Sequence, residues 1–149
     1  ELSVDENLSL GSLPPRYWPD GQPAANWSKD DLYELFPPLQ ALRDRPAGNL
    51  SGGEQQMLTV ARSLMGNPFL LLLDEPSEGV APIVVRQMVE MIHALKARGT
   101  SILLSEQNLP FARLVADRAY VLEKGMIRYS GAMSVLLNDE NLKRQYLTL

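Results

Sequence analysis

The spacing of apolar residues predicts helices in the first third of the chain. It indicates a short helix over residues 3–10, where Ser3 and a glutamate three positions later form a capping box. A second helix follows Ser28 and is interrupted by Pro37. Residues 11–27, which lie between the two helices, contain four prolines and two glycines and are typical of a loop. The aromatic residues that we expect to hold this loop against an apolar surface are Tyr17, Trp18 and Trp27.

Strands that alternate with helices are predicted after residue 50. A helix begins at Ser51 and runs to about residue 65, with apolar residues three and four positions apart. Residues 69–73 are all apolar, which is typical of a strand buried on both faces. A helix over residues 82–98 and a second buried strand over residues 100–105 follow.

The remaining pattern predicts a helix over residues 109–117, strands over residues 119–123 and 126–129, and closing helices over residues 134–138 and 140–147. The pair Lys124-Gly125 is typical of a hairpin turn between the two strands. Because strands alternate with helices from residue 69 onward, we predict an α/β domain with a parallel sheet.

Composition excludes several classes of protein. The 149 residues carry 14 Lys and Arg against 18 Asp and Glu, so the net charge of −4 gives no sign of a nucleic-acid partner. There is no cysteine and one histidine, which excludes disulfides, thiol catalysis and histidine-rich metal sites. That histidine, His93, lies in the middle of a predicted helix, and we expect it to be a surface or packing residue. No apolar run approaches the roughly 20 residues of a transmembrane helix. No signal-peptide pattern is visible, so we expect a cytoplasmic location.

Two glycines, Gly52 and Gly53, lie at the start of the helix that Ser51 opens. Small residues at a helix N-terminus let a phosphate approach the backbone N–H groups, and the helix dipole also favours an anion there. The alternative is that Ser51 and Glu54 form an ordinary capping box that happens to contain glycines.

Two carboxylates, Asp74 and Glu75, follow the strand predicted over residues 69–73. Ligands of α/β proteins bind at the carboxyl ends of strands, where one carboxylate can hold Mg²⁺ through water and a second can polarise an attacking water. The alternative is an ordinary solvated strand end.

These motifs resemble those of the ATP-binding-cassette (ABC) ATPases. Residues 50–56, Leu-Ser-Gly-Gly-Glu-Gln-Gln, resemble the signature motif of that family, and residues 70–76 resemble a Walker B motif with its catalytic glutamate. Residues 77–82 occupy the position of the D-loop, although Ala81 stands where an acidic residue is usual. Gln107 falls where most members have a switch histidine. Residues 77–82 with Ala81, the segment around Gln107, and residues 116–125 resemble the sequences of one branch of this family. That branch is the ATP-binding subunits of branched-chain amino-acid importers and their urea or amide relatives.

The resemblance implies an incomplete P-loop NTPase domain. Residues 1–65 would form the helical subdomain with the signature motif, and residues 66–149 the C-terminal part of the RecA-like core. No Gly-Lys pair occurs in the chain, so the P-loop is absent from it. The family pattern places that loop, the adenine-stacking aromatic residue and the Q-loop ahead of residue 1. We therefore expect the chain alone not to hydrolyse ATP.

The resemblance also implies a role for each site residue, with ATP and Mg²⁺ as cofactors. Asp74 would hold Mg²⁺ through water, Glu75 would be the general base, and Gln107 would position the γ-phosphate. The residues implied to bind the nucleotide of a partner subunit are Ser51, Gly52, Gly53 and Gln55. Those implied to lie at the dimer interface are Ser77, Glu78 and Gly79.

The implied partners are a second ABC ATPase subunit, transmembrane permease subunits and, indirectly, a periplasmic or extracellular binding protein. The location would be cytoplasmic, on the inner face of the cell membrane. One alternative is an ABC ATPase of DNA repair or chromosome maintenance, although the chain lacks the long heptad repeats of that class. A second alternative is a truncated, non-catalytic module that supplies only its signature loop to another chain.

Overall fold

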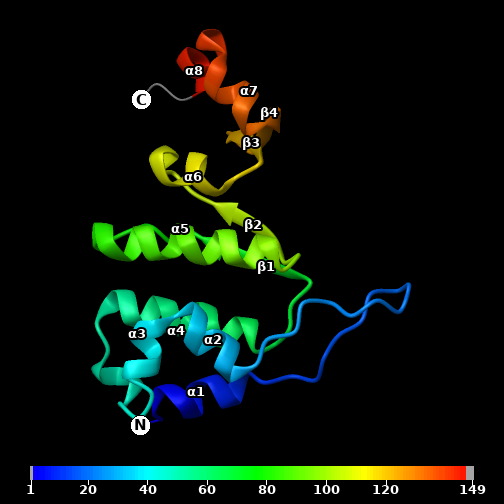
Figure 1. Ribbon diagram of the computed structural model, residues 1–149. Helices are drawn as coiled ribbons and strands as arrows, with labels where there is room; N and C mark the ends of the chain where they lie inside the picture. Colours follow the sequence, from blue (N-terminus) through cyan, green and yellow to red (C-terminus); the bar gives the residue numbers. More distant parts are fainter. Residues whose placement is uncertain (1, 147–149) are drawn as a thin grey trace. The chain divides into compact units, whose positions relative to one another are not determined.

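The computed structural model describes residues 2–146, which divide into two compact units (Figure 1). The first unit ends at Ser105 and the second begins at Glu106, and each is described by itself. The predicted boundary between residues 65 and 66 falls inside the first unit. That boundary was predicted between two subdomains of the family, and the division into compact units does not test it. It therefore stays a prediction.

The first unit begins with a group of helices. The first, α1 (Val4–Gly11), packs against the fourth, α4 (Gly52–Leu64). Along the chain, α1 is followed by α2 (Lys29–Leu35), α3 (Pro37–Ala41) and a 3₁₀ turn (Ala47–Asn49), which precede α4. Ser3, Ser28 and Ser51 each cap a helix with an acidic residue three positions later, so the predicted helix starts are confirmed.

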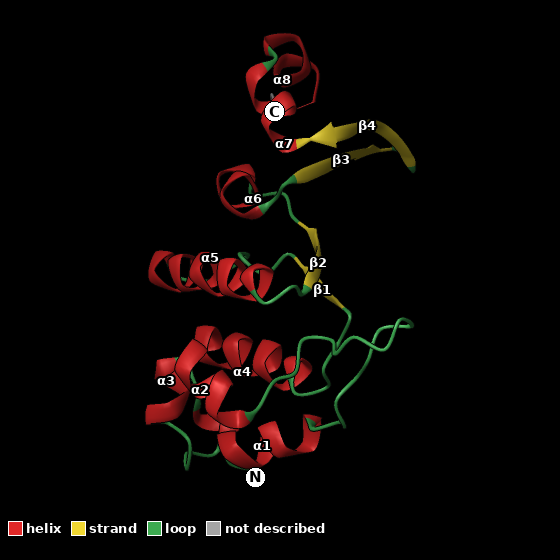
Figure 2. Cartoon of the chain, turned by 45° about the vertical axis from the view of Figure 1, so that its right-hand side comes forward, coloured by secondary structure: helices red, strands yellow, loops and turns green. Residues whose placement is uncertain are grey.

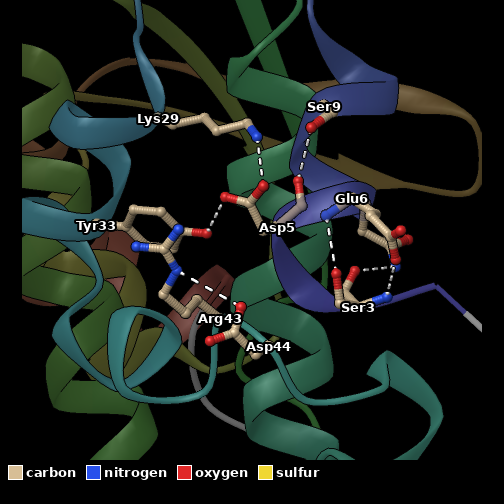
Figure 3. A network of polar contacts seen from close by, with 9 residues as sticks. Ser3, Asp5, Glu6, Ser9, Lys29, Tyr33, Arg43 and Asp44 are labelled. Atoms are coloured by element: carbon tan, nitrogen blue, oxygen red, sulfur yellow. Dashed lines mark hydrogen bonds and ion pairs between the residues drawn. The ribbon is translucent and has the colours of Figure 1, made fainter.

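Asp5 joins α1 to α2 through two side-chain contacts (Figure 3). Its carboxylate accepts a hydrogen bond from Lys29 Nζ at 2.6 Å and another from the Tyr33 hydroxyl at 2.9 Å. The Lys29 contact, followed by the Tyr33 contact, holds the pKa of Asp5 below its usual range. Burial and the nearby Asp5 carboxylate raise the pKa of Tyr33, so this phenol stays a hydrogen-bond donor at neutral pH.

Asn67 closes the loop between α1 and α2 at its base. This buried side chain accepts a hydrogen bond from the Trp27 backbone N–H at 2.8 Å and donates one to the Leu13 carbonyl at 2.9 Å. Trp27 is itself buried, and the Trp18 ring lies 4.5 Å from that of Phe69. The expectation that aromatic residues hold the loop is therefore confirmed for those two residues. It is wrong for Tyr17, which is 63% exposed and whose backbone pairs with Pro23 within the loop.

We expect Asn67→Ala to lower the free energy of unfolding by about 2 kcal/mol, because it leaves a buried backbone N–H and a carbonyl without partners. Urea denaturation of the chain followed by tryptophan fluorescence measures this change. The matched control is Asn26→Ala, since Asn26 is exposed. Equal stability of the two variants would contradict the role given to Asn67.

Strands β1 (Leu70–Asp74) and β2 (Ser101–Ser105) form a parallel pair in which Leu72 lies opposite Leu103. The helix between them, α5 (Pro82–Ala97), lies on one face of the pair (Figure 2). The strand residues Leu71 and Leu73 are buried, whereas on the opposite face Leu72 is 66% exposed. The parallel sheet is confirmed, but burial on both faces is wrong within residues 2–105, because no element of that unit covers the second face.

This exposed face, formed by Leu70, Leu72 and Leu103, is expected to make the isolated chain self-associate at micromolar concentration. Replacing all three leucines by lysine removes the apolar patch and adds like charges. Sedimentation velocity should then show mostly monomer, while the control Leu10→Lys, an exposed leucine of α1, should sediment like the parent. A monomeric parent would contradict this expectation.

Arg98, which follows α5, joins that helix to α2 and to the end of the loop. Its guanidinium donates to Asp31 Oδ1 at 2.7 Å and lies 4.5 Å from the centroid of the Trp27 ring. Hydrogen bonds from the Ser28 side chain and backbone, followed by the Arg98 contact, lower the pKa of Asp31 to about 2.

A pKa lowered in the folded state stabilises the fold above the unfolded pKa, and this contribution is lost as the pH falls. We therefore expect the stability of the parent to decrease between about pH 4 and pH 2 more steeply than that of Asp31→Asn. Urea midpoints measured across this range test the expectation, with Asp30→Asn, at an exposed neighbour, as the control. Parallel pH profiles for the parent and Asp31→Asn would contradict it.

The second unit contains a helix, a hairpin and two further helices. Helix α6 (Leu109–Val115) precedes the antiparallel strands β3 (Arg118–Glu123) and β4 (Met126–Ala132). Lys124 and Gly125 both have positive φ, as a two-residue hairpin turn requires, so the predicted turn is confirmed.

Helices α7 (Met133–Asn138) and α8 (Glu140–Tyr146) close the second unit. The predicted end of the last helix, residue 147, lies outside the described residues. No helix within residues 2–146 has both the length and the apolar character needed to cross a bilayer.

Candidate functional site

The N-terminus of α4 is held by a capping box. Ser51 donates to Glu54 Oε2 from its backbone N–H at 2.7 Å and from its hydroxyl at 2.8 Å. These bonds hold the pKa of Glu54 below its usual range. The predicted capping box between Ser51 and Glu54 is thus confirmed. It is compatible with a binding role, because Ser51 is exposed. To donate to a phosphate, its hydroxyl would exchange Glu54 for the phosphate oxygen.

The two glycines of this helix start have different surroundings. A Cβ placed on Gly52 would meet no atom within 4 Å, so this backbone is open to a ligand. A Cβ placed on Gly53 would lie 2.7 Å from Cγ2 of Val84 in α5. Gly53 is therefore required by packing within the chain, whether or not a phosphate also approaches it. Sequence reasoning missed the contact with Val84, because the two residues are far apart along the chain.

Two glutamines of α4, Gln55 and Gln56, also differ in their exposure and in their hydrogen-bond partners. The Gln55 side chain is exposed and donates from Nε2 to the Leu50 carbonyl at 3.1 Å. Gln56 is half-buried and donates from Nε2 to the Pro76 carbonyl at 2.9 Å. The second bond connects the helix that carries the glycines to the turn that follows β1. Sequence reasoning missed it, since Gln56 stood in the motif without an assigned contact.

Asp74 and Glu75 lie at the carboxyl end of β1, as predicted. Asp74 is exposed and Glu75 half-buried. The backbone of Glu75 has φ 43°, in the left-handed region, and its N–H donates to the Ser105 carbonyl of β2 at 2.8 Å. A left-handed conformation costs a residue other than glycine about 1 kcal/mol or more, and such strain is commonly found at functional sites.

The next turn contains the residues predicted to lie at a dimer interface. Ser77 is buried, with 8% of its surface exposed, whereas Glu78 and Gly79 are exposed. The Glu78 N–H donates to the Glu75 carbonyl at 3.1 Å. Gly79 has φ 68° and open space where a Cβ would be. Glu78 and Gly79 are therefore accessible to another protein, and Ser77 is accessible only through movement of the turn.

Gln107 belongs to the second unit, whereas Glu75 belongs to the first. Gln107 is exposed, and its backbone N–H donates to Glu106 Oε2 at 3.0 Å. Gln107 does not cap the helix α6 that follows it. Asn108 is the N-cap, and its Oδ1 accepts the Phe111 N–H at 3.1 Å. His93 is exposed on α5, as expected.

The carboxylates at the end of β1 are suited to a magnesium ion whose remaining ligands are water and phosphate oxygens. Within residues 2–146, no group of three or more His, Cys, Asp or Glu side chains could hold a metal alone. Mg²⁺ commonly takes one or two protein carboxylates and fills its remaining positions with water and phosphate oxygens. An exposed Asp74 beside Glu75 meets this requirement if a nucleotide supplies the phosphates.

Comparisons with known proteins agree with these motifs. The family model described as ABC transporter matches residues 1–78, more than half of the chain. The chain is 43% identical over 146 residues to the high-affinity branched-chain amino acid transport ATP-binding protein BraG of Pseudomonas aeruginosa, covering 98% of this chain and 60% of BraG. It is 38% identical over 118 residues to the lipopolysaccharide export system ATP-binding protein LptB of Escherichia coli (strain K12), covering 79% of this chain and 48% of LptB.

The fold resembles that of solved ATP-binding cassettes. The ADP conformation of MJ1267, described as an ATP-binding cassette of an ABC transporter, matches with a TM-score of 0.74 and 29% identity. This match covers 100% of the present chain and 64% of that one.

The chain belongs to the ABC transporter family. It has the α/β fold of an ABC ATPase domain, and it spans about 60% of the length of BraG. The prediction of an incomplete P-loop NTPase domain of this family, similar to the branched-chain amino acid branch, is confirmed.

Proposed function

We propose that these residues are the signature and Walker B portion of the ATP-hydrolysing subunit of an ABC importer. The observation that carries the proposal is the bond from Gln56 to the Pro76 carbonyl, which holds a glycine-rich helix start beside the strand-end pair Asp74 and Glu75. One element is suited to bind a phosphate and the other to bind Mg²⁺ and activate water. The similarity to BraG supports a branched-chain amino acid or related small polar solute as the cargo.

Each residue has a role in this proposal that its surroundings support. The open backbone at Gly52 and the exposed Ser51 and Gln55 bind the nucleotide of a partner subunit, with Gly53 as the packed member of the loop. Asp74 holds Mg²⁺ through water, which supplies charge stabilisation to the phosphates when bound. Glu75 orients the attacking water and accepts its proton. Gln107 is proposed to donate an amide N–H to the γ-phosphate.

The proposed partners follow from the same assignment. Ser77, Glu78 and Gly79 lie at the interface with a second ABC ATPase subunit, and Glu78 and Gly79 are exposed as this requires. Residues 1–49 face the transmembrane permease subunits, which receive cargo from a binding protein. The chain then works on the cytoplasmic face of the membrane, bound to the permease.

The test compares two proteins. One is the 149-residue chain, and the other, called here the complete ATPase, joins these residues to a P-loop segment. The complete ATPase should bind Mg-ATP, dimerise when ATP is present and hydrolyse it, whereas the 149-residue chain should show only background hydrolysis. Equal hydrolysis by the two proteins, or none by the complete ATPase, would overturn the proposal.

A second candidate function is a non-catalytic module that lends its signature loop to another chain. The absence of any Gly-Lys pair from the 149 residues favours it, because a chain without a P-loop can still present Gly52 to a partner's nucleotide. To distinguish the two functions, the 149-residue chain is mixed with an ABC subunit whose own signature serine and glycines have been replaced. Restored ATP hydrolysis that survives Glu75→Gln in the added chain would identify the module.

A further inference from the structure

The Gln56 side chain makes a direct polar contact between α4, the helix that begins with the signature glycines, and the turn that carries Glu75. Its Nε2 lies 2.9 Å from the Pro76 carbonyl, 20 positions along the chain. Proline has no backbone N–H, so residue 76 offers the turn only an acceptor. The Pro76 carbonyl accepts the hydrogen bond from the Gln56 amide. This bond is partly buried, so water screens it only weakly.

The position of Pro76 makes this bond relevant to the carboxylate before it. Glu75 has a left-handed backbone that the surrounding structure must hold, since the conformation is unfavourable for glutamate. One side of the turn is held by the Glu75 N–H bond to the Ser105 carbonyl at 2.8 Å. Gln56 holds the following residue from a different element, because its amide comes from α4 and not from the sheet.

A second contact arises on the same face of α4. Gly53 lies one helical turn before Gln56, and its backbone approaches Val84 so closely that a Cβ would lie 2.7 Å from that side chain. The first turns of α4 therefore meet the turn after β1 at Pro76 and the first turn of α5 at Val84. With both contacts present, the glycine-rich helix start and the Glu75 turn have a fixed separation.

We propose that Gln56 is a positioning residue for the hydrolysis reaction: its amide holds the Glu75 turn in place relative to the signature glycines. The inference rests on the proposed function and extends it. Glu75 acts there on the nucleotide of its own chain, whereas Gly52 faces the nucleotide of the partner. Gln56 lies between these two elements, so the position of the general base depends on the position of the signature helix.

The first experiment measures amide hydrogen exchange in the 149-residue chain. In Gln56→Leu, the Glu75 amide should exchange faster than in the parent, while the amides of Leu71 and Leu73 in β1 should be unchanged. The matched control is Thr59→Ala, which removes an exposed side-chain bond of the same helix, from the Thr59 hydroxyl to the Gln55 carbonyl. Unchanged exchange at Glu75 in Gln56→Leu would overturn the proposal.

The second experiment measures turnover in the complete ATPase. Gln56→Leu and Gln56→Glu lack the donor, so kcat should fall by between about tenfold and 100-fold, with KM for ATP within about twofold of the parent. Gln56→Lys keeps an N–H donor of similar reach and should restore most of the turnover, whereas a purely steric role would leave it as impaired as Gln56→Leu. Faster exchange at Glu75 without a loss of kcat would overturn the positioning role.

The two proposals fail in different ways. If the complete ATPase shows no turnover that depends on Glu75, the proposed function is wrong, and the exchange experiment still decides whether Gln56 holds the turn. If turnover depends on Glu75 but not on the donor at position 56, the proposed function stands and the inference about Gln56 is overturned.

Discussion

Glu75→Gln is expected to lower the kcat of the complete ATPase by about 100-fold or more, because the amide cannot accept the proton of the attacking water. The affinity for Mg-ATP should change little, since the substitution keeps the size of the side chain and leaves Asp74 for the metal ion. Single-turnover hydrolysis and equilibrium binding of ATP, measured on the same preparation, separate the two effects.

The matched control is Glu90→Gln, which removes an exposed carboxylate of α5 outside the proposed site. It should hydrolyse ATP at the parent rate. Retention of most of the turnover in Glu75→Gln would remove Glu75 from the role of general base. A parallel loss of ATP binding would instead assign Glu75 to nucleotide binding.

The two signature glycines are expected to respond differently to alanine. Gly52→Ala adds a Cβ that meets nothing in the chain, so stability should be unchanged. The Cβ would point into space that a partner's phosphate occupies in the proposed function. We therefore expect turnover of the complete ATPase to fall at least about tenfold, the order that a 1.4 kcal/mol loss of transition-state binding produces.

Gly53→Ala should lower both stability and turnover, because its Cβ would lie 2.7 Å from Val84 Cγ2. The double variant Gly53→Ala with Val84→Ala removes the atom that causes the clash, and Val84→Ala alone is its control. If the double variant recovers the activity of Val84→Ala, packing explains the glycine at position 53. If it recovers stability but not turnover, a phosphate also needs the space at Gly53. Loss of stability in Gly52→Ala would contradict the distinction between the two positions.

The local features of the fold were predictable from the sequence because short-range chemistry determines them. Ser51 with Glu54 predicts the start of α4, and the continuous apolar run predicts β1 within one residue. Lys124-Gly125 predicts the hairpin turn. The N-cap of α6 also has a local signal, since Asn108 is of a residue type favoured at that position, unlike the neighbouring Gln107.

Contacts between segments that are distant along the chain could not be predicted from a local sequence pattern. Asn67 bonds a backbone group 40 positions away, and Gln56 bonds one 20 positions away, so neither partner is visible in a local pattern. The exposure of Leu72 has a related reason, since a run of leucines indicates that a strand is suited to burial on both faces but not which segment covers each face. At the candidate site, the motif predicted the residue types, and the structure separated Gly52 from Gly53 by their surroundings.

The loop that Asn67 closes has a practical consequence for labelling the protein. Because one side chain binds both Leu13 and Trp27, the two ends of the loop stay together whatever the length of chain between them. The tip is a tight turn in which the Gly21 N–H donates to the Trp18 carbonyl, and Asp20 is exposed there. Lengthening a closed loop costs only about 0.6 kcal/mol for each doubling. An epitope or fluorophore-binding peptide inserted after Asp20 thus lies at the tip of this loop, and it reports on assembly while leaving the residues that hydrolysis is proposed to use unchanged.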